Sequence, residues 1–366
     1  MRNLGIYVHI PFCKQKCAYC DFCSFCADKK TEEEYFLTLK KEIEKKSNKD
    51  FQISSIYFGG GTPSFVDEKH IVQTIEAIKK NFSVSGDAEV TIECNPCSTT
   101  KEKLVAYKMA GFNRISFGVQ SFDDEVLSLI GRLHNGKQAE EAIMLAKEVG
   151  FENISADLML GLPKQTKEVI EKDIEQLVNL GVSHVSTYML MLEEGTPLFS
   201  KVKSGEVLVS DEDEQVEFYD YVVKKLSSCD FEQYEVSNFA KGKRYSKHNM
   251  NYWRRGEYLG FGLSAHSFLS EVRFANSDTF EGYENGCLSQ VEKLSNEEIF
   301  EEFVMLGLRY FEGVDVKKLQ EVDKKKTEKI LSCDYFEKGI LSIINEKIVL
   351  NSKFYVINNE IIANLI

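Results

Sequence analysis

Residues 7–22 have the sequence YVHIPFCKQKCAYCDF, in which an apolar run leads into a loop that carries three cysteines. The run over residues 4–10 predicts a β-strand, and Cys13, Cys17 and Cys20 follow it with the spacing CxxxCxxC. In α/β folds the loops after the strands carry the chemistry, so these thiols are expected at a functional edge of a sheet. Three thiolates can bind three irons of a 4Fe-4S cubane, which usually has four cysteine ligands, and leave one iron open to a non-protein ligand.

Two more cysteines, Cys23 and Cys26, lie in the same loop and keep other interpretations open. Together with Cys17 and Cys20 they form an unbroken CxxCxxCxxC ladder, which could bind zinc or a fully ligated cluster. Structural zinc sites usually join two distant CxxC pairs, which makes zinc the weaker interpretation. A second cluster with a ligand elsewhere, or five plain structural thiols, are further alternatives. Cys23 and Cys26 are assigned no role.

Outward from this loop, short apolar runs alternate with amphipathic stretches as far as about residue 200. The further strand candidates are residues 54–58, 89–93, 114–118, 153–158 and 184–190. One of the intervening helices is expected to begin with a capping box of Thr99 and Glu102. Six β-then-α units in series predict an α/β fold whose parallel sheet has helical crossovers, either open or curled into a partial barrel.

The alternation fades after about Pro197. We expect a helix over residues 210–226, then a Gly-rich aromatic segment, and a helix over 296–309 that Ser295 and Glu298 cap. The helix and β-rich runs that follow predict a small α+β domain of the winged-helix-like kind. The sequence thus divides into a barrel core over residues 1–200, a connecting segment over 201–290 and a C-terminal domain over 291–366.

Composition narrows the class of protein. The chain has 366 residues, a hydrophobic share of 43% and a net charge of −13, as in acidic globular proteins. The negative charge argues against nucleic acid as the main partner, because phosphate backbones attract Lys/Arg-rich faces. No apolar run approaches the roughly 20 residues of a spanning helix, and the N-terminal residues lack the apolar core of a signal peptide. We therefore expect a cytoplasmic protein with reduced thiols, in which the scattered Cys229, Cys287 and Cys333 are buried.

Glycine and polar motifs follow the predicted strands at their carboxyl ends. The segment GGGTP follows the second strand, and its glycines let the backbone approach a ligand closely. Its residues are Gly59, Gly60, Gly61, Thr62 and Pro63. The polar candidates at the later strand ends are Glu93, Gln120, Arg132 and Asp157. Each could be an ordinary surface or capping group by itself, but their positions at successive strand ends favour one shared site.

In this order the motifs resemble those of the radical S-adenosylmethionine superfamily, and the resemblance covers most of the chain. The chain looks most like the branch that contains oxygen-independent coproporphyrinogen III dehydrogenases and heme chaperones. The resemblance implies that the open iron is chelated by the amino and carboxylate groups of S-adenosylmethionine. It also implies that one-electron reduction cleaves the sulfonium to a 5′-deoxyadenosyl radical.

The resemblance implies roles for single residues as well. The segment Gly59 to Thr62 contacts the methionine amino group, and Glu93 is a ligand-binding carboxylate. Arg132 pairs with the methionine carboxylate, for which a guanidinium fork is suited. Gln120 contacts the nucleoside, and Asp157 bonds the ribose hydroxyls. The flanking contacts are Tyr7 and Tyr19.

Two features separate the dehydrogenases from the chaperones of this branch. The dehydrogenase motif resembles CxxxCxxCxC, but Phe22 stands here at the position of its fourth cysteine. The dehydrogenases also carry an N-terminal extension before the first strand, whereas this chain has six residues before Tyr7. Both features favour a chaperone.

Residues 247–253, with the sequence KHNMNYW, resemble the HNxxYW motif of the chaperones. A histidine there could offer a neutral imidazole to heme iron, and aromatic residues could cover the macrocycle. His248 is therefore the candidate heme ligand, with His266 and Cys23 as substitutes. By composition alone, such a histidine would more often be an ordinary loop or core residue.

We therefore expect a heme chaperone that binds a 4Fe-4S cluster, S-adenosylmethionine and heme, and that delivers heme to acceptor proteins. Respiratory acceptors would bring peripheral contact with a membrane. Two alternatives stay open: an oxygen-independent coproporphyrinogen III dehydrogenase, and a non-redox metal-binding interaction module. The sequence predicts neither the acceptor, nor the oligomeric state, nor whether S-adenosylmethionine is cleaved.

Overall fold

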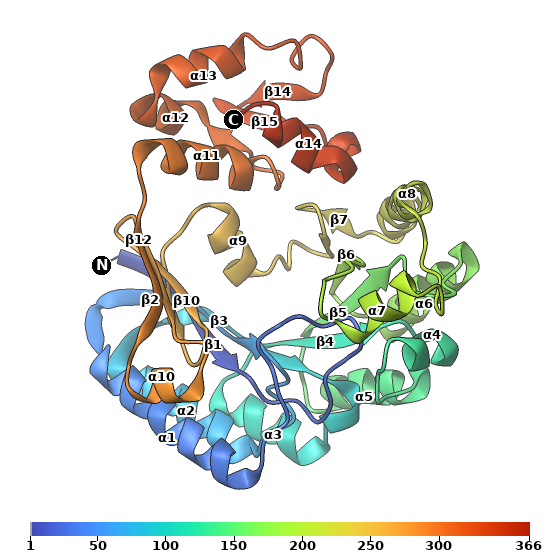
Figure 1. Ribbon diagram of the computed structural model, residues 1–366, viewed down its shortest axis with the longest axis vertical. Coiled ribbons are helices and arrows are strands. Elements are labelled where there is room, and N and C mark those ends of the chain that lie inside the picture. Colours follow the sequence, from blue (N-terminus) through green and yellow to red (C-terminus); the bar gives the residue numbers. More distant parts are fainter. Residues whose placement is uncertain (1) are drawn as a thin grey trace.

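The computed structural model describes residues 2–366 and contains a curved sheet with helices along its outer face (Figure 1). Six consecutive parallel strands form its centre: β1 (Arg2–Ile10), β2 (Asn48–Gly60), β3 (Phe82–Cys94), β4 (Arg114–Gln120), β5 (Asn153–Leu160) and β6 (His184–Met189). The crossovers contain α1 (Lys29–Lys45), α2 (Glu68–Asn81), α3 (Lys101–Ala110), α4 (Asp124–Leu129), α5 (Gly136–Glu148) and α6 (Lys167–Leu180). The six predicted strands are confirmed, and most are longer than the apolar runs that predicted them.

The sheet does not close on itself. The strands outside its centre are β7 (Glu232–Gln233), β8 (Asn238–Ala240), β9 (Tyr258–Phe261), β10 (His266–Leu269), β11 (Val272–Asn276) and β12 (Leu288–Lys293). The order of the 12-stranded sheet is β12-β11-β10-β9-β1-β2-β3-β4-β5-β6-β8-β7. Because β1 pairs with β9 and β6 pairs with β8, the two ends of the parallel region never meet. The expected partial barrel is confirmed in its open form.

The remaining helices before the C-terminal part are α7 (Pro197–Lys203), α8 (Glu212–Ser228), α9 (Lys247–Trp253) and α10 (Phe280–Glu284). The C-terminal part consists of α11 (Asn296–Gly307), β13 (Val314–Asp315), α12 (Val316–Val322), α13 (Lys324–Leu331), β14 (Leu341–Ile344), β15 (Lys347–Leu350) and α14 (Asn358–Ala363). Its three short strands form a separate antiparallel sheet, and it has its own hydrophobic core. This agrees with the small α+β module expected from the sequence, and α11 lies against α9 of the barrel (Figure 1).

Two helix caps were predicted, and one of them is wrong. Ser295 and Glu298 form the expected capping box at the start of α11. The cap of α3 is Thr100, whose side chain accepts from the backbone three residues on. Thr99 does not cap the helix because its hydroxyl donates to the Asn95 carbonyl at 2.9 Å, within the preceding turn.

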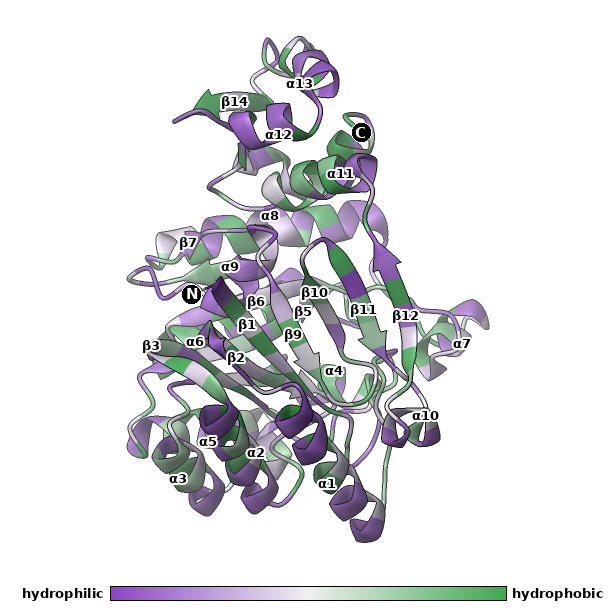
Figure 2. Cartoon of the chain, turned by 90° about the vertical axis from the view of Figure 1, so that its left-hand side faces the viewer, coloured by the Kyte–Doolittle hydropathy of each residue, from purple (hydrophilic) through white to green (hydrophobic). Residues whose placement is uncertain are grey.

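The two faces of the central sheet differ in chemistry, because successive side chains of a strand point to opposite faces. On β2 and β3, Ile56, Phe58, Val90 and Ile92 join the hydrophobic core that packs against the outer helices. The alternate residues point to the inner, concave side, which we call the lumen, and many of them are polar. Figure 2 shows the matching pattern, with hydrophilic residues over much of the outer helices α1, α2 and α5.

The lumen has two ends. The cavity end lies at the carboxyl ends of the parallel strands, and the base end lies at their amino ends, beside α9. Among residues 2–366, no helix combines the length and the apolar character needed to cross a bilayer. Polar side chains gather along the lumen, and this makes it the place to look for a site.

Candidate cofactor site

The cluster loop, residues 11–28 between β1 and α1, is tied down by backbone hydrogen bonds. The Cys13 N–H donates to the Phe25 carbonyl at 3.0 Å, which folds the loop back on itself. The Ala18 N–H donates to the Ile130 carbonyl at 3.0 Å, which joins the loop to the end of α4. These bonds satisfy backbone groups and fix the positions of the cysteines between them.

Cys13, Cys17 and Cys20 line one cavity together. Cys13 is 9% exposed, and its Sγ lies 3.4 Å from the Thr62 hydroxyl oxygen. Burial raises the pKa of the Cys13 and Cys20 thiols, and the negative charge of neighbouring thiols raises both further. Coordination to iron reverses such a shift, since a metal-bound thiol loses its proton. Cys13 and Cys20 are therefore poorly placed to ionise alone and well placed to ionise around a cationic cluster.

The CxxCxxCxxC ladder does not converge on one point. Cys23 packs against the hydrophobic core, and the exposed Cys26 thiol donates to the Lys14 carbonyl at 3.3 Å. Within residues 2–366, no group of three or more His, Cys, Asp or Glu side chains is close enough to hold a single metal ion. A zinc site needs its ligands at about 2.0–2.3 Å from one atom, so this arrangement gives the zinc alternative no support. A cubane instead spreads its ligands over separate irons.

The cavity that the cysteines line lies at the cavity end of the lumen and has a volume of about 530 Å³, within the usual range of ligand sites. Its lining includes these residues predicted from the sequence: Cys13, Cys17, Tyr19, Cys20, Gly60, Gly61, Thr62, Glu93, Gln120, Arg132 and Asp157. Three predicted residues lie outside the lining, namely Tyr7, Gly59 and His248. The lining also includes residues that sequence reasoning missed: Tyr57, Asn95, Gly118, Met159, Tyr188, Met189 and Met191.

The glycines of the GGGTP segment are needed because other atoms crowd the end of β2. At Gly61, a Cβ would lie 2.8 Å from the carbonyl oxygens of Ile10 and Phe12. The Gly61 N–H donates to the Ile10 carbonyl at 2.8 Å, so this close approach joins β2 to the start of the cluster loop. At Gly59, a Cβ would lie 3.0 Å from the carboxyl group of Glu93. Gly59 thus serves the cavity indirectly, by leaving room for that carboxylate.

Glu93 is held at the cavity by two hydrogen bonds. The Tyr57 hydroxyl donates to Glu93 Oε1 at 2.7 Å, and the Gly60 N–H donates to Oε2 at 3.3 Å. Burial raises the pKa of Glu93 to about 7, and the negative charge of Asp157 adds to the rise. Tyr7, expected as a flanking contact, lies behind Tyr57 with the ring centroids 6.4 Å apart. Glu93 is therefore an acceptor whose ionised form gains from a positively charged ligand.

Arg132 and Gln120 bring unpaired polar atoms to the cavity. Arg132 donates from Nη1 to Cys17 Sγ at 3.4 Å and from Nη2 to the Gly118 carbonyl. Gln120 ends β4 with φ +70°, where the register between β4 and β5 shifts. Arg132 Nε and Gln120 Oε1 are buried, and neither has a hydrogen-bond partner within residues 2–366. Unpaired buried polar atoms are costly and are expected where a polar ligand binds.

Asp157, on β5, completes the polar lining. The Ser116 hydroxyl donates to Asp157 Oδ1 at 3.3 Å, and burial raises the pKa of the carboxyl group. The predicted residues of the lining thus supply three thiols, a guanidinium, two carboxylates, an amide and a glycine backbone. This donor set fits an iron–sulfur cluster beside a nucleoside that carries an amino acid. The unpaired atoms of Arg132 and Gln120 are the observation that makes the fit more than a list of residue types.

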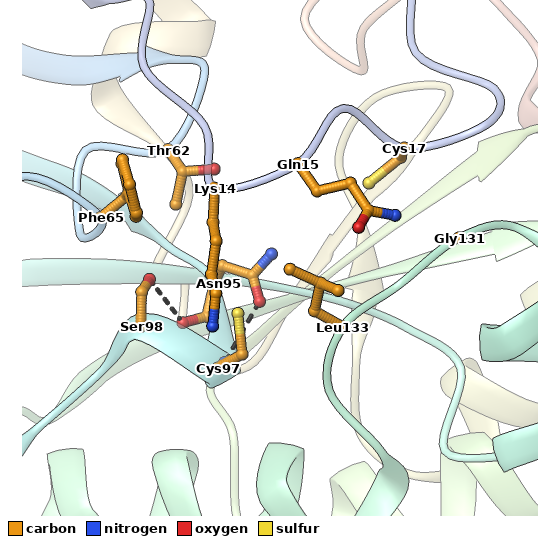
Figure 3. A pocket seen from close by; sticks show the side chains of 10 residues that line it. All are labelled: Lys14, Gln15, Cys17, Thr62, Phe65, Asn95, Cys97, Ser98, Gly131 and Leu133. Carbon is orange, nitrogen blue, oxygen red and sulfur yellow. Dashed lines mark hydrogen bonds between the residues drawn. The ribbon is translucent and has the colours of Figure 1, made fainter. Parts of the chain in front are cut away.

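A second, smaller pocket adjoins the cluster loop (Figure 3). It is lined by Cys17 of the loop and by Cys97, which follows β3 on the short 3-10 helix Pro96–Ser98. Burial raises the pKa of the Cys97 thiol, and the charge of Arg132 opposes the rise. Cys97 forms a CxxC pair with Cys94, a signal that sequence reasoning left unused.

His248 lies on α9 at the base end of the lumen. Its side chain is 1% exposed, with Nδ1 2.9 Å from Ser55 Oγ and Nε2 2.9 Å from Tyr252 Oη. Burial lowers the pKa of His248 to about 3, so the imidazole is neutral. Both ring nitrogens are thus engaged within the protein. Of the alternative heme ligands, His266 on β10 is exposed and Cys23 is half-buried.

Comparison with known proteins identifies the family of the chain. Residues 7–177 match the model of the radical SAM superfamily. The chain is 34% identical to the heme chaperone HemW of Bacillus subtilis over 367 residues, which cover 97% of each chain. It is 36% identical to the HemW of Haemophilus influenzae over 302 residues, which cover 79% of this chain and 78% of the relative.

A solved structure and a eukaryotic relative extend the comparison. The structure of coproporphyrinogen III oxidase (HemN) from Escherichia coli matches 100% of this chain and 90% of its own, with a TM-score of 0.85 and 22% identity, and so shares the fold. The mouse mitochondrial radical S-adenosyl methionine domain-containing protein 1 is 34% identical over 341 residues, which cover 88% of this chain and 77% of that protein. The chain therefore belongs to the radical SAM superfamily and, within it, to the family of the HemW heme chaperones.

Proposed function

We propose that this chain is a heme chaperone, which binds heme beside a 4Fe-4S cluster and S-adenosylmethionine and passes it to acceptor proteins. Family membership supports binding of the 4Fe-4S cluster and of S-adenosylmethionine, because radical SAM proteins carry both. The names of the curated relatives support the heme function. The reduced thiols that a cluster requires support a cytoplasmic location. Contact with a membrane through respiratory acceptors stays a prediction.

In this proposal Cys13, Cys17 and Cys20 ligate the cluster, which would supply one-electron chemistry when S-adenosylmethionine is bound. Arg132 binds the methionine carboxylate, because its Nε is buried without a partner within residues 2–366. Glu93 accepts from the amino group. These residues orient the nucleoside and keep water away from it, whether or not it is ever cleaved.

The remaining polar residues hold the nucleoside. We assign Gln120 Oε1, buried without a partner in the described chain, to the base or sugar. Asp157 accepts from the ribose hydroxyls, and Tyr19 covers the ligand from the cluster loop. Gly60, Gly61 and Thr62 offer backbone groups at the end of β2.

The observation that carries the chaperone proposal is an apolar mouth on the cavity. Phe22, at the position of the dehydrogenases' additional cysteine, is 65% exposed, and Met191 is 70% exposed. Both line the cavity, as does Met189. Large exposed apolar side chains beside a cavity indicate a surface that a ligand covers, and a porphyrin is flat and apolar enough to do so. We propose that heme packs against this mouth.

The second candidate function is the oxygen-independent oxidation of coproporphyrinogen III. The fold shared with HemN favours it, and a cavity open at the cluster could admit a porphyrinogen. The exposed Phe22 counts against it, because the additional cysteine of the dehydrogenase motif is missing at this position.

Anaerobic reconstitution followed by three parallel assays tests the proposal. The assays are heme titration by absorption spectroscopy, release of deoxyadenosine, and conversion of coproporphyrinogen III. We expect heme uptake near one per chain and no sustained porphyrinogen turnover. Sustained turnover with no heme uptake would instead establish the dehydrogenase.

Variants of the mouth sharpen the test. Met191→Ser should weaken heme binding about tenfold, because it replaces apolar contact worth about 1–2 kcal/mol. The control is Met109→Ser, since Met109 is 84% exposed on α3, outside the cavity lining. If heme affinity falls equally in the two variants, or in neither of them, heme does not pack against the apolar mouth.

A further inference from the structure

The histidine of the HNxxYW segment lies directly beneath the candidate S-adenosylmethionine site, on the inside of the lumen. The His248 ring is stacked on the Tyr57 ring, with the centroids 5.1 Å apart and the planes at 23°. Tyr57 in turn lines the cavity and donates to Glu93 Oε1 at 2.7 Å. His248, Tyr57 and Glu93 thus form one column from the base end to the cavity end.

The lower end of this column is held firmly. His248 Nδ1 and Nε2 each lie 2.9 Å from a hydroxyl oxygen, of Ser55 on β2 and of Tyr252 on α9. The backbone N–H of His248 donates to Glu89 Oε1 on β3 at 3.2 Å, which holds the start of α9 against the sheet. The two hydroxyl contacts of the ring, to β2 and to its own helix, leave it no other orientation without breaking a buried hydrogen bond.

The upper end of the column depends on the lower. Tyr57 contributes the shorter of the two hydrogen bonds to Glu93, and its ring rests on the imidazole. Removal of the imidazole leaves a void beneath Tyr57, into which a buried aromatic ring tends to move. The hydroxyl then retreats from Glu93, and the carboxylate loses both position and a stabilising donor.

We propose that His248 is a positioning residue for S-adenosylmethionine: through Tyr57 it holds the Glu93 carboxylate where the bound amino acid needs it. The inference rests on the proposed nucleoside site, and it gives the HNxxYW segment a role distinct from ligation of heme iron. Since α11 lies against α9, it also joins the C-terminal part to the nucleoside site through α9.

The lumen contains a matched control. His184, at the start of β6, is 0% exposed, and its ring nitrogens lie 2.8 Å from Ser155 Oγ and 2.7 Å from Tyr234 Oη. It therefore shares a serine partner, a tyrosine partner and near-complete burial with His248, and in addition Arg114 Nη2 approaches its Nδ1 at 3.4 Å. Its ring lies beside that of Tyr234, with the centroids 5.7 Å apart, rather than beside Tyr57. Loss of either imidazole should lower the melting temperature alike, but only loss of His248 should reach Glu93.

The experiment compares His248→Ala, His248→Phe and His184→Ala as reconstituted full-length proteins. Equilibrium dialysis measures S-adenosylmethionine affinity, absorption titration measures heme, and thermal melting measures stability. We expect His248→Ala to weaken S-adenosylmethionine binding about tenfold, the usual effect of losing a hydrogen bond to a charged group. His248→Phe should recover most of that loss, because a flat ring again supports Tyr57. Heme stoichiometry should stay unchanged in both.

A double variant tests the route of the effect. In a Tyr57→Phe background, where no hydroxyl reaches Glu93, His248→Ala should cost less than about twofold in S-adenosylmethionine affinity. The inference is overturned if His184→Ala weakens S-adenosylmethionine binding as much as His248→Ala, or if His248→Ala abolishes heme uptake with that affinity intact. Heme uptake by the unaltered chain tests the proposed chaperone function separately, so the two ideas can fail independently.

Discussion

Two buried histidines at the base end of the lumen and two buried polar side chains at its cavity end differ in their hydrogen bonding. At the base end, His184 and His248 each have both ring nitrogens within hydrogen-bond distance of a serine and a tyrosine. At the cavity end, Arg132 Nε and Gln120 Oε1 are buried without partners in the described chain. The contrast is limited to these residues, since Arg114 Nε and, on α9, Trp253 Nε1 are also buried without a partner in the described chain. The Arg114 guanidinium approaches His184 Nδ1 at 3.4 Å. Satisfied polar groups stabilise a structure, whereas unsatisfied ones prepare a site for a ligand.

The first prediction, with the largest effect, concerns the thiols that define the cavity end. Cys17→Ala should reduce the iron bound after reconstitution to a small fraction of that in the unaltered chain, because two thiolates cannot hold a cubane that depends on three. The charge-transfer absorption of the cluster should vanish with it. Iron and sulfide analysis of anaerobically purified protein provides the measurement.

The control for this prediction is Cys23→Ala, from the same loop. Cys23 packs against the hydrophobic core and should leave iron content unchanged. Iron loss in Cys23→Ala equal to that in Cys17→Ala would revive the ladder of four cysteines as the ligands of a fully ligated cluster.

The second prediction concerns Arg132. Arg132→Lys should weaken S-adenosylmethionine binding about 100-fold, because a point charge replaces a fork whose charged hydrogen bonds are worth about 3 kcal/mol. Arg244→Lys is the control, since Arg244 pairs with Glu152 on the surface. If the affinity for S-adenosylmethionine falls less than threefold in Arg132→Lys, the unpaired Nε is not a ligand-binding atom. Calorimetric titration with S-adenosylmethionine measures both variants.

The cavity end was also the easier end to predict from the sequence. Cysteine spacing, the glycine run and polar residues at strand ends are local signals, and ten of the residues they identified line the cavity, together with Tyr19, which only the family resemblance indicated. Strand order followed from the β-then-α repetition, because crossovers between parallel strands are helical. The open edges of the sheet did not follow, since β8 and β9 come from a segment without alternating runs.

The base end was harder, because its contacts join residues far apart in the chain. His248 meets Ser55 across 193 residues, and no spacing rule links a helix after residue 240 to the second strand. Tyr57 was missed for a different reason. It lies two residues before Gly59, so strand alternation puts its side chain on the lumen side. The hydrogen bond from its hydroxyl to Glu93 depends on how β2 and β3 pair, which the sequence does not specify.

The third prediction compares a glycine that is crowded by other side chains with one that has open space around it. Gly59→Ala should weaken S-adenosylmethionine binding about tenfold, because the added Cβ would stand 2.9 Å from the Tyr57 ring and 3.0 Å from the Glu93 carboxyl group. Gly86→Ala, where nothing lies within 4 Å of the added atom, should leave affinity unchanged. If the two variants bind S-adenosylmethionine equally well, Glu93 does not contact the ligand. That result would also count against the role proposed for His248.

The fourth prediction, with the smallest effect, is a pH dependence that arises at Glu93. Its pKa of about 7 means that the carboxylate fraction falls about threefold between pH 7.5 and pH 6.5, and S-adenosylmethionine affinity should fall by the same factor. Glu93→Gln removes this component and leaves any titration of the ligand's own amino group. A profile that is identical in the two proteins would contradict the assignment of Glu93.

Stability without ligand should show the opposite sign. The pKa of Glu93 is raised from 4.5 to about 7 in the folded chain, so the folded state holds its proton longer than the unfolded state does. Between pH 4.5 and 7 the free energy of unfolding therefore declines as the pH rises, and Glu93→Gln should flatten that decline. If ionised Glu93 both binds the cationic ligand and destabilises the ligand-free fold, the two pH dependences must appear together and with opposite sign. Denaturant titrations at several pH values, with and without S-adenosylmethionine, distinguish such a carboxylate from a group that is merely buried.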